Sequence, residues 1–279
     1  MVAQGLVVLS DADTDAPDLP AVGTVSTGDE WDGGGHELGV AAAGRGRVWV
    51  DRPYFTGNPT GEWLAGMASG VLAAGGYCQL GNEQNLPLED FSGGPGAWAA
   101  LDAEVRALVA DPSRVLAMPP SPGVAGWQEW VTEAGPFACH AYGSCQQMVD
   151  VVRWYLDNRQ GDVYITELNF GAGNTVDVDQ WANLELAPFL DWASTQERVK
   201  TALYFAWRWS ESANLPTSVD AAGTAVQTVL ENWTDPPSGF DIALVRDQLW
   251  SIGETLENAG YPWFGQSIKA SVALSKGDP

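Results

Sequence analysis

Two glutamates each follow a short apolar stretch of the chain, at the point where that stretch ends. Glu83 comes shortly after Tyr77–Leu80, within Gln-Leu-Gly-Asn-Glu-Gln-Asn, and Glu167 closes Tyr-Ile-Thr-Glu. In a glycosidase that retains the anomeric configuration, one carboxyl group donates a proton and a second acts as nucleophile, with the two groups roughly 5 Å apart. One of the pair must therefore keep its proton near neutral pH while the other stays ionised. These glutamates predict that chemistry if the fold brings them together.

The segments that must position the glutamates alternate between strand-like and helical patterns from about residue 47 to residue 235. Strands are predicted at 48–50, 77–80, 114–118, 137–142, 162–167 and 199–209, with two further candidates at 6–9 and 22–26. Helices are predicted at 62–74, 96–110, 124–133, 146–158, 178–195 and 221–233. Continuous apolar strands of this kind indicate a parallel sheet covered by helices on both faces. Eight such strands predict an α/β fold, the (β/α)8 TIM barrel.

The N-terminal third of this barrel is compressed, and its C-terminal end is extended. No helix is predicted between the first strands, and His36 falls in a glycine-rich loop that we place on the surface. An open doubly wound sheet is the competing architecture, but no glycine-rich phosphate turn follows a strand here. We predict one barrel over residues 1–235. A second segment, 236–279, contains an amphipathic helix at 240–258 and an aromatic tail, which we expect to pack on the barrel.

Polar side chains stand at the carboxyl ends of the predicted strands, which share one face of a parallel barrel. Besides the two glutamates, they include a guanidinium, an imidazole, a phenol, amides and indoles, contributed by Arg52, Asn82, Asn85, His140, Tyr142, Trp207 and Trp209. A nearby cation or phenol would keep one glutamate ionised. Asn82 offers an amide to a sugar hydroxyl, and either tryptophan would stack on a sugar ring. His140 could equally be a buried core residue, and Arg52 could equally anchor a structural salt bridge.

Four of these elements, in this order along the chain, resemble the clan A glycoside hydrolases. They are Asn82-Glu83 after the fourth strand, His140-x-Tyr142 after the sixth, Thr166-Glu167 at the seventh and a tryptophan at the end of the eighth. The resemblance covers about residues 45–210, and it implies a (β/α)8 fold and a retaining mechanism. It also implies that Glu83 is the acid/base, Glu167 the nucleophile and Tyr142 a hydrogen-bonding partner of Glu167.

Two other stretches, Gly81–Leu86 and Met118–Gly123, resemble glycosidase-like domains of phage tail and lysis proteins. The chain departs from the clan A pattern at one position that matters for charge. The arginine that the clan has near the end of the second strand is not clearly placed there, and Arg52 lies one strand later. The electrostatic environment of Glu167 therefore depends on where Arg52 points.

The charge balance excludes several classes of partner. The formal net charge is −23, with three lysines against thirty-six acidic residues. A nucleic-acid partner is not expected, because phosphate contacts need a basic face, and an anionic membrane surface would repel the chain.

No apolar stretch reaches the ~18 residues of a membrane-spanning helix, and the N-terminus lacks the basic region of a signal peptide. A substrate outside the cell would be reached by lysis, on a virion or as part of a longer precursor.

Neither a metal nor a cofactor is predicted. Cys78 and Cys139 lie within apolar strand-like runs, so we interpret them as buried hydrophobic residues. A disulfide between Cys139 and Cys145 is the less favoured alternative. The cysteines lack zinc spacing, and the aspartates of Asp11–Asp15 lack the following glycine and glutamate of a calcium loop.

The sequence therefore predicts a retaining O-glycoside hydrolase that acts on a cell-surface or cell-wall polysaccharide. The alternative is a non-catalytic carbohydrate-binding or structural barrel in a larger assembly such as a virion tail, with other subunits of that assembly as partners. The separation of the two carboxyl groups discriminates between these hypotheses. Catalysis needs roughly 5 Å and an open cleft, whereas a scaffold tolerates a filled one.

Overall fold

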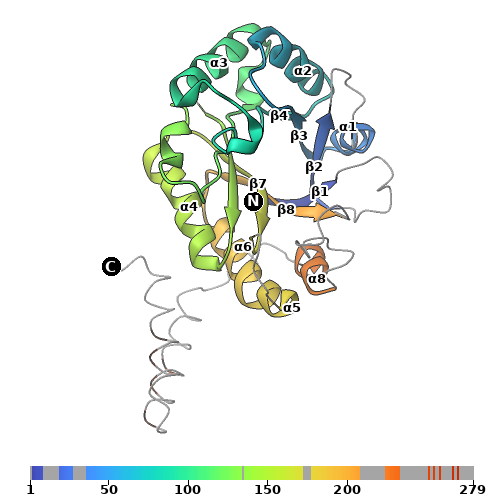
Figure 1. Cartoon of the computed structure of the whole chain (residues 1–279). Coiled ribbons are helices and arrows are strands. Elements are labelled where there is room, and N and C mark those ends of the chain that lie inside the picture. The colour runs from blue at the N-terminus through green and yellow to red at the C-terminus, as the bar shows by residue number, and fades with distance from the viewer. Residues whose placement is uncertain are drawn as a thin grey trace. The chain divides into compact units, whose positions relative to one another are not determined.

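Eight parallel strands form a nearly closed barrel. The computed structural model describes residues 2–8, 19–27, 36–133, 135–171, 177–207 and 224–232, with single residues at 251, 254, 258, 266 and 269. In this part of the chain the strands lie in one sheet, in the order β5-β4-β3-β2-β1-β8-β7-β6, and a parallel bridge between Ala117 and Phe137 links its two edges. Figure 1 shows the strands surrounded by helices. The predicted α/β class, the (β/α)8 barrel, is confirmed.

Strands and helices alternate along the chain. The strands are β1 (Ala3–Val8), β2 (Ala21–Thr27), β3 (Val48–Tyr54), β4 (Tyr77–Gln79), β5 (Val115–Leu116), β6 (Phe137–Tyr142), β7 (Val163–Asn169) and β8 (Val199–Trp207). The α-helices are α1 (His36–Gly44), α2 (Gly61–Ala73), α3 (Gly94–Leu108), α4 (Cys145–Asn158), α5 (Val178–Trp181), α6 (Ala187–Ser194) and α8 (Thr224–Asn232). Short 3-10 turns cover Pro87–Glu89, Pro112–Arg114 and Trp127–Trp130, and a π-helical turn, Ala182–Leu186, joins α5 to α6.

Side chains along the strands alternate between the barrel interior and the outer layer of helices. Val50, Tyr164 and Leu203 belong to the interior cluster. Cys78 and Cys139 belong instead to the two clusters between strands and helices. Both thiols are free and buried, which confirms their interpretation as small hydrophobic residues.

Local sequence signals explain where the helices begin. Thr60 caps α2, because its hydroxyl accepts a hydrogen bond from the Trp63 amide at 3.2 Å,. Ser144 and Gln147 form a reciprocal capping box at the start of α4,. From there α4 turns an apolar stripe toward the strands, made of Met148, Val149, Val152 and Tyr155.

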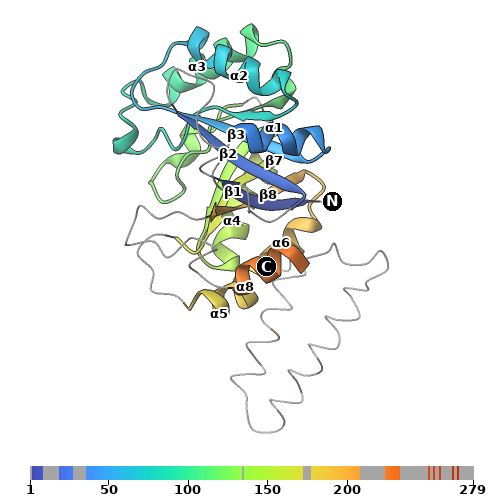
Figure 2. The same ribbon diagram turned by 90° about the vertical axis from the view of Figure 1, so that its right-hand side faces the viewer.

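A helix that the sequence did not reveal, α1, lies beside β2 and β3 (Figure 2). It begins at His36, so the prediction of a glycine-rich loop at this residue is wrong. The segment His-Glu-Leu-Gly-Val-Ala-Ala-Ala-Gly has few large apolar side chains to mark a helical stripe,. Its small residues allow close packing instead. A Cβ atom at Gly39 would lie 2.1 Å from the Trp49 ring, so the helix approaches β3 more closely than a larger residue allows.

The helix predicted over 124–133 is also wrong. Only Trp127–Trp130 forms a helical turn, of the 3-10 type, and it follows Gly126 in a left-handed conformation with φ of 76°. The aromatic residues that produced the helical pattern pack against other rings. Trp127 contacts Trp154 and Tyr155, and Trp130 contacts Phe91. Ring packing and the left-handed glycine therefore override the helical periodicity.

The chain divides into two compact units, Met1–Trp233 and Thr234–Pro279. The helix predicted at 240–258 and the aromatic tail fall almost entirely outside the described residues, so their packing on the barrel stays a prediction. Among the residues that the structure describes, no helix combines the length and the apolar character needed to cross a membrane.

Candidate active site

A bulge in β7 turns Glu167 toward the barrel axis. β6 and β7 pair regularly up to Cys139 with Ile165, but the next pair joins His140 to Glu167, so Thr166 is the extra residue. Thr166 and Glu167 consequently face the same side of the strand. Thr166 lines a small void in the barrel interior, together with Val7, Gly23, Thr24, Val50, Arg52, Gln79 and Leu203. Glu167 follows it toward the carboxyl end of the strands.

Three side chains from other strands meet the Glu167 carboxylate. The Arg52 guanidinium from β3 and the Tyr142 hydroxyl from β6 each donate a hydrogen bond to it, and His140 Nδ1 lies 3.6 Å away. Burial alone would raise the pKa of Glu167, because its side chain is only 6% exposed. The charges of His140 and Arg52 and the hydrogen bonds from Tyr142 and Arg52 outweigh burial, so they lower this pKa below its ordinary value,. Glu167 is therefore ionised at neutral pH.

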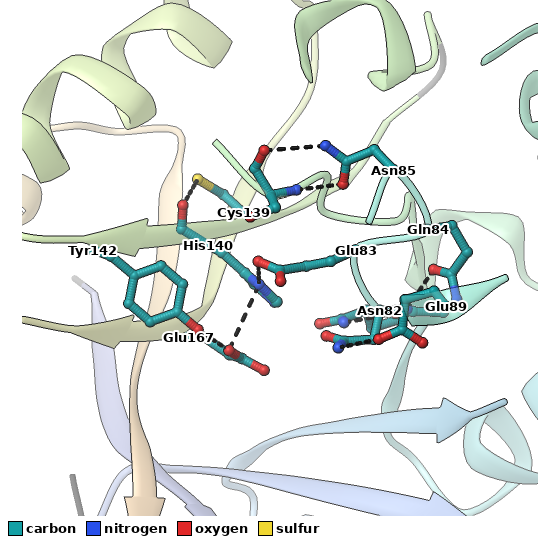
Figure 3. A network of polar contacts seen from close by, with 12 residues as sticks. Asn82, Glu83, Gln84, Asn85, Glu89, Cys139, His140, Tyr142 and Glu167 are labelled. Carbon is teal, nitrogen blue, oxygen red and sulfur yellow. Dashed lines mark hydrogen bonds and ion pairs between the residues drawn. The ribbon is translucent and has the colours of Figure 1, made fainter. Parts of the chain in front are cut away.

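Glu83 faces Glu167 across a shared histidine. The buried His140 directs Nδ1 to Glu83 Oε1 at 2.8 Å and to Glu167 Oε2 at 3.6 Å (Figure 3). A hydrogen on Nδ1 can therefore be donated to an oxygen of either carboxyl group. The distances of 2.8 Å and 3.6 Å, laid end to end, set an upper limit of about 6.4 Å between the two carboxylate oxygens.

The two carboxyl groups have unequal surroundings. The Glu83 side chain is 13% exposed, about twice the value for Glu167, which is 6%. Within the described part of the chain, His140 is the hydrogen-bonding partner of the Glu83 carboxylate. Glu167 has Arg52 and Tyr142 in addition. The pair therefore consists of one tightly held anion and one carboxyl group that is more accessible.

The loop after β4 holds Glu83 in an unusual backbone conformation. Its φ is 54°, in the left-handed region, which costs a non-glycine residue about 1 kcal/mol,. The Glu83 amide donates to the Pro119 carbonyl at 3.1 Å, and the Glu83 carbonyl accepts from the Leu86 amide at 2.7 Å. Strained backbone of this kind persists where surrounding contacts fix it, and it is concentrated at functional sites.

Asn82 connects Arg52 to a residue that the sequence reasoning missed. Its Oδ1 accepts from Arg52 Nη1 at 2.7 Å, and its Nδ2 donates to Glu89 Oε1 at 3.4 Å. Glu89 is 1% exposed, and its Oε2 has no hydrogen-bonding partner among the described residues. Burial raises the pKa of Glu89, although the Asn82 hydrogen bond and the Arg52 charge oppose this. No sequence signal marks Glu89, because it lies in a 3-10 turn and not at a strand end.

Tyr54 is a second residue that was missed. It ends β3 two residues beyond Arg52, so strand alternation places both side chains on the same face,. Tyr54 is 36% exposed. It offers an aromatic ring and a hydroxyl at the rim of the site. Counting every second residue along the strand from Arg52 would have identified Tyr54 as a site residue.

Six of the nine predicted site residues meet in this region, and the other three do not enter the described contacts. The six are Arg52, Asn82, Glu83, His140, Tyr142 and Glu167. Arg52 forms its salt bridge with Glu167, and the buried His140 lies between the two carboxyl groups. Asn85 instead hydrogen-bonds to the Ser121 backbone. The side chain of Trp207 and the whole of Trp209 lie outside the described residues.

This arrangement can perform proton transfer and nucleophilic attack on a bound substrate. An ionised carboxylate, fixed by a cation and a phenol, stands opposite a more accessible carboxyl group, and both contact the same imidazole,. Across the described residues, no group of three or more His, Cys, Asp or Glu side chains is placed to hold a metal ion.

Fold and site together define a (β/α)8 barrel with paired carboxylates at the carboxyl ends of its strands. No family model matches the sequence, and no curated protein matches it either. Solved structures of glycoside hydrolases do resemble it. An endo-β-1,3-glucanase of glycoside hydrolase family 128, subgroup II, from Sorangium cellulosum is 16% identical, with a TM-score of 0.51 over 84% of this chain and 99% of that chain.

Two further glycoside hydrolases have the same fold. A family 5, subfamily 18, member from Bifidobacterium longum subsp. infantis is 11% identical, with a TM-score of 0.58 over 85% of this chain and 80% of that chain. A family 128, subgroup IV, endo-β-1,3-glucanase from Lentinula edodes is 12% identical, with a TM-score of 0.50 over 82% and 98% of the two chains. At these identities the similarity establishes the barrel fold.

Proposed function

We propose that this chain is a retaining O-glycoside hydrolase that cleaves a polysaccharide. The observation that supports this best is the histidine shared by Glu83 and Glu167. It limits the separation of their nearest oxygens to about 6.4 Å, which suits the roughly 5 Å spacing of retaining enzymes better than the about 6.5–9.5 Å of inverting ones. The asymmetry of their surroundings supports Glu167 as the nucleophile and Glu83 as the acid/base.

In the first step, Glu167 attacks the anomeric carbon and forms a covalent glycosyl ester. The bond between this carbon and the glycosidic oxygen breaks, and the proton of Glu83 goes to that oxygen as it leaves. Arg52 and Tyr142 hold the Glu167 carboxylate in its ionised form and in one orientation. His140 contacts both carboxyl groups, so it can stabilise the negative charge that forms on Glu83 as the proton leaves.

In the second step, water replaces the enzyme on the anomeric carbon. Glu83, now ionised, removes a proton from the water molecule, whose oxygen bonds to the anomeric carbon while the ester bond to Glu167 breaks. Two inversions at the same carbon give net retention. Glu83 is then protonated again, and the Glu167 carboxylate is restored for the next cycle.

We propose a neutral β-glucan of a cell surface or cell wall as the substrate. Two structural neighbours are named endo-β-1,3-glucanases. The site itself is rich in carboxyl groups, from Glu83, Glu89 and Glu167, in a chain of net charge −23. An anionic polysaccharide would be repelled by such a surface, whereas a neutral one would not. The resemblance to phage tail and lysis proteins, and with it a place in a virion, stays a prediction.

Intact-mass labelling tests the proposal. The protein is incubated with 2,4-dinitrophenyl 2-deoxy-2-fluoro-β-glucoside and with the corresponding β-1,3-linked disaccharide, because the fluorine slows hydrolysis of the covalent intermediate. We expect one glycosyl adduct on the parent chain and none on Glu167→Gln. Glu185→Gln is the control, since Glu185 is a half-buried glutamate whose carboxylate accepts from the Cys145 amide at the start of α4. It should be labelled like the parent.

The opposite result favours the alternative function. If no fluoroglycoside of a wider sugar panel labels the parent, and Glu167→Gln still binds laminarin as the parent does, the chain is a non-catalytic carbohydrate-binding barrel. An adduct that persists in Glu167→Gln would contradict the assignment of the nucleophile while leaving a retaining mechanism in place.

A further inference from the structure

The position of Glu83 depends on a backbone conformation that the residue itself does not favour. Its φ of 54° is shared by just one other non-glycine position among the described residues, Asp90 with 52°. Gly81, two residues before, also has positive φ, at 67°. Contacts from elsewhere must therefore hold this stretch, because an unconstrained glutamate would return to negative φ and redirect its carboxyl group.

The contacts come from the loop after β5. The Glu83 amide donates to the Pro119 carbonyl at 3.1 Å. Two residues further on, Asn85 Nδ2 donates to the Ser121 carbonyl at 3.1 Å, and Asn85 Oδ1 accepts from the Ser121 amide at 2.7 Å. Figure 3 shows the two Asn85 bonds on the far side of Glu83 from Glu167. Pro119 is buried, and the segment Pro-Pro-Ser-Pro gives this loop a rigid backbone,.

We propose that Asn85 is a positioning residue for Glu83, which rests on the proposed function above. Both ends of the Asn85 amide are used by the Ser121 backbone, so the side chain ties the β4 loop to the β5 loop and does not face the carboxylates. Together with the hydrogen bond from the Glu83 amide to the Pro119 carbonyl, the Asn85 contacts hold the loop at Glu83 and two residues after it. The Glu83 carboxyl group is thereby kept on His140 Nδ1, at 2.8 Å, and opposite Glu167.

Loss of the hydrogen bonds between Asn85 and Ser121 should have a specific effect on the kinetics. Displacement of a catalytic group by about 1 Å can cost on the order of 100-fold in rate. If the displaced group is the general acid, the loss appears only where the leaving oxygen needs a proton. Laminarin needs one, because its leaving group is a sugar alkoxide. 2,4-Dinitrophenyl β-laminaribioside does not, because its leaving group is a stabilised phenolate. A general structural defect would slow both reactions equally.

The experiment compares Asn85→Ala with Asn58→Ala on these two substrates. Asn58 makes the same kind of tie in the loop after β3, since its Nδ2 donates to Ser92 Oγ at 3.1 Å and its Oδ1 accepts from the Ser92 amide at 3.2 Å. For Asn85→Ala we expect kcat/KM on laminarin to fall about 100-fold, with the aryl glycoside slowed less than about threefold. Asn58→Ala should leave both values near those of the parent.

Two outcomes would overturn the inference. One is an equal loss of kcat/KM on both substrates, and the other is an unchanged kcat/KM on laminarin. If Asn85→Ala does not fold, Asn85→Asp replaces it. Asp keeps the volume and the acceptor for the Ser121 amide but loses the donor, so the same substrate dependence should appear in weaker form.

A crystal structure of the variant gives a test that needs no activity. We expect Glu83 to leave the left-handed region and its carboxyl group to leave His140. If φ stays near 54° and the contact to His140 Nδ1 remains, the positioning role is refuted. If the parent chain forms no fluoroglycosyl adduct, the proposed function has failed, and this structural comparison still decides whether Asn85 fixes Glu83.

Discussion

Replacement of Arg52 by methionine should move the acidic limb of the pH–activity profile to higher pH. Methionine keeps much of the length of arginine but removes its charge and its hydrogen bonds to Glu167 and Asn82. In the parent, burial pushes the pKa of Glu167 up, and the charges of His140 and Arg52 push it down further. Without Arg52 the effect of burial is opposed less, so the pKa of Glu167 rises and a larger fraction of Glu167 is protonated at a given pH.

The magnitude follows from the burial of the pair. The Arg52 and Glu167 side chains are 10% and 6% exposed, so solvent screens their interaction little. Removal of one partner of a buried ion pair costs about 3–5 kcal/mol. His140 and Tyr142 remain beside Glu167, so the loss lies at the lower end of that range. It appears as a rise in the pKa of Glu167, because only the ionised carboxylate is stabilised by the Arg52 charge,.

The same substitution should also lower the stability of the folded protein at neutral pH. Because the folded parent depresses the pKa of Glu167, this residue stabilises the fold above its unfolded pKa, about 4.3. That contribution is lost as the pH falls through the lower folded value. In Arg52→Met the folded pKa of Glu167 is higher than in the parent, so ionised Glu167 stabilises the fold less at neutral pH,. The variant should therefore unfold at a lower temperature than the parent at pH 7, with a smaller difference at pH 3.

The assay is the rate of labelling by 2,4-dinitrophenyl 2-deoxy-2-fluoro-β-glucoside as a function of pH, because this step needs the nucleophile but no proton for the leaving group. Arg106→Met is the matched control. Arg106 Nε bonds to Asp102 Oδ2 at 2.8 Å within α3, and the two side chains are 11% and 2% exposed. The acidic limb of the control should not move. An acidic limb that stays in place in Arg52→Met would refute the electrostatic role given to Arg52.

Three further predictions concern neighbouring side chains. Glu83→Ala should lose activity on laminarin, and azide should restore turnover of the dinitrophenyl glycoside about tenfold or more, with a β-glycosyl azide as product; an α-azide would contradict retention. Tyr142→Phe should lower kcat about tenfold and raise the pKa of Glu167 less than Arg52→Met does, because a hydrogen bond is lost but no charge. Glu89→Gln should raise the unfolding temperature at pH 8 and have a smaller effect at pH 4. The folded pKa of Glu89 is raised by burial, so stability is lost as the pH rises through that pKa, and calorimetry at both pH values measures this,.

Most of what the sequence could predict about the site concerns residues at the carboxyl ends of strands. Parallel strands present their carboxyl ends on one face, so Arg52, His140, Tyr142 and Glu167 could be expected to converge without knowledge of their contacts. The partners of Glu167 now account for its ionisation. Which of the two glutamates acts as acid and which as nucleophile stays a prediction until labelling is done.

The remainder depends on contacts between residues distant in sequence or on small residues that leave no pattern. Glu89 reaches the site through a 3-10 turn and contacts Asn82, which no periodicity indicates. Asn85 finds its partner at Ser121, thirty-six residues away. The α1 helix was missed because Gly39 and its small neighbours make a surface for close packing against Trp49, and hydrophobic periodicity detects only large side chains,.

The bulge in β7 makes the direction of Glu167 a matter of strand pairing. Ile165 packs outward, so regular alternation would place Thr166 inward and Glu167 outward, but Thr166 occupies an additional position and Glu167 pairs with His140 instead. A chain that kept all three residues but paired them regularly would keep the barrel and turn the carboxylate into the apolar layer beneath the helices. The register of β7 against β6 therefore decides, together with the identity of residue 167, whether such a barrel presents a nucleophile.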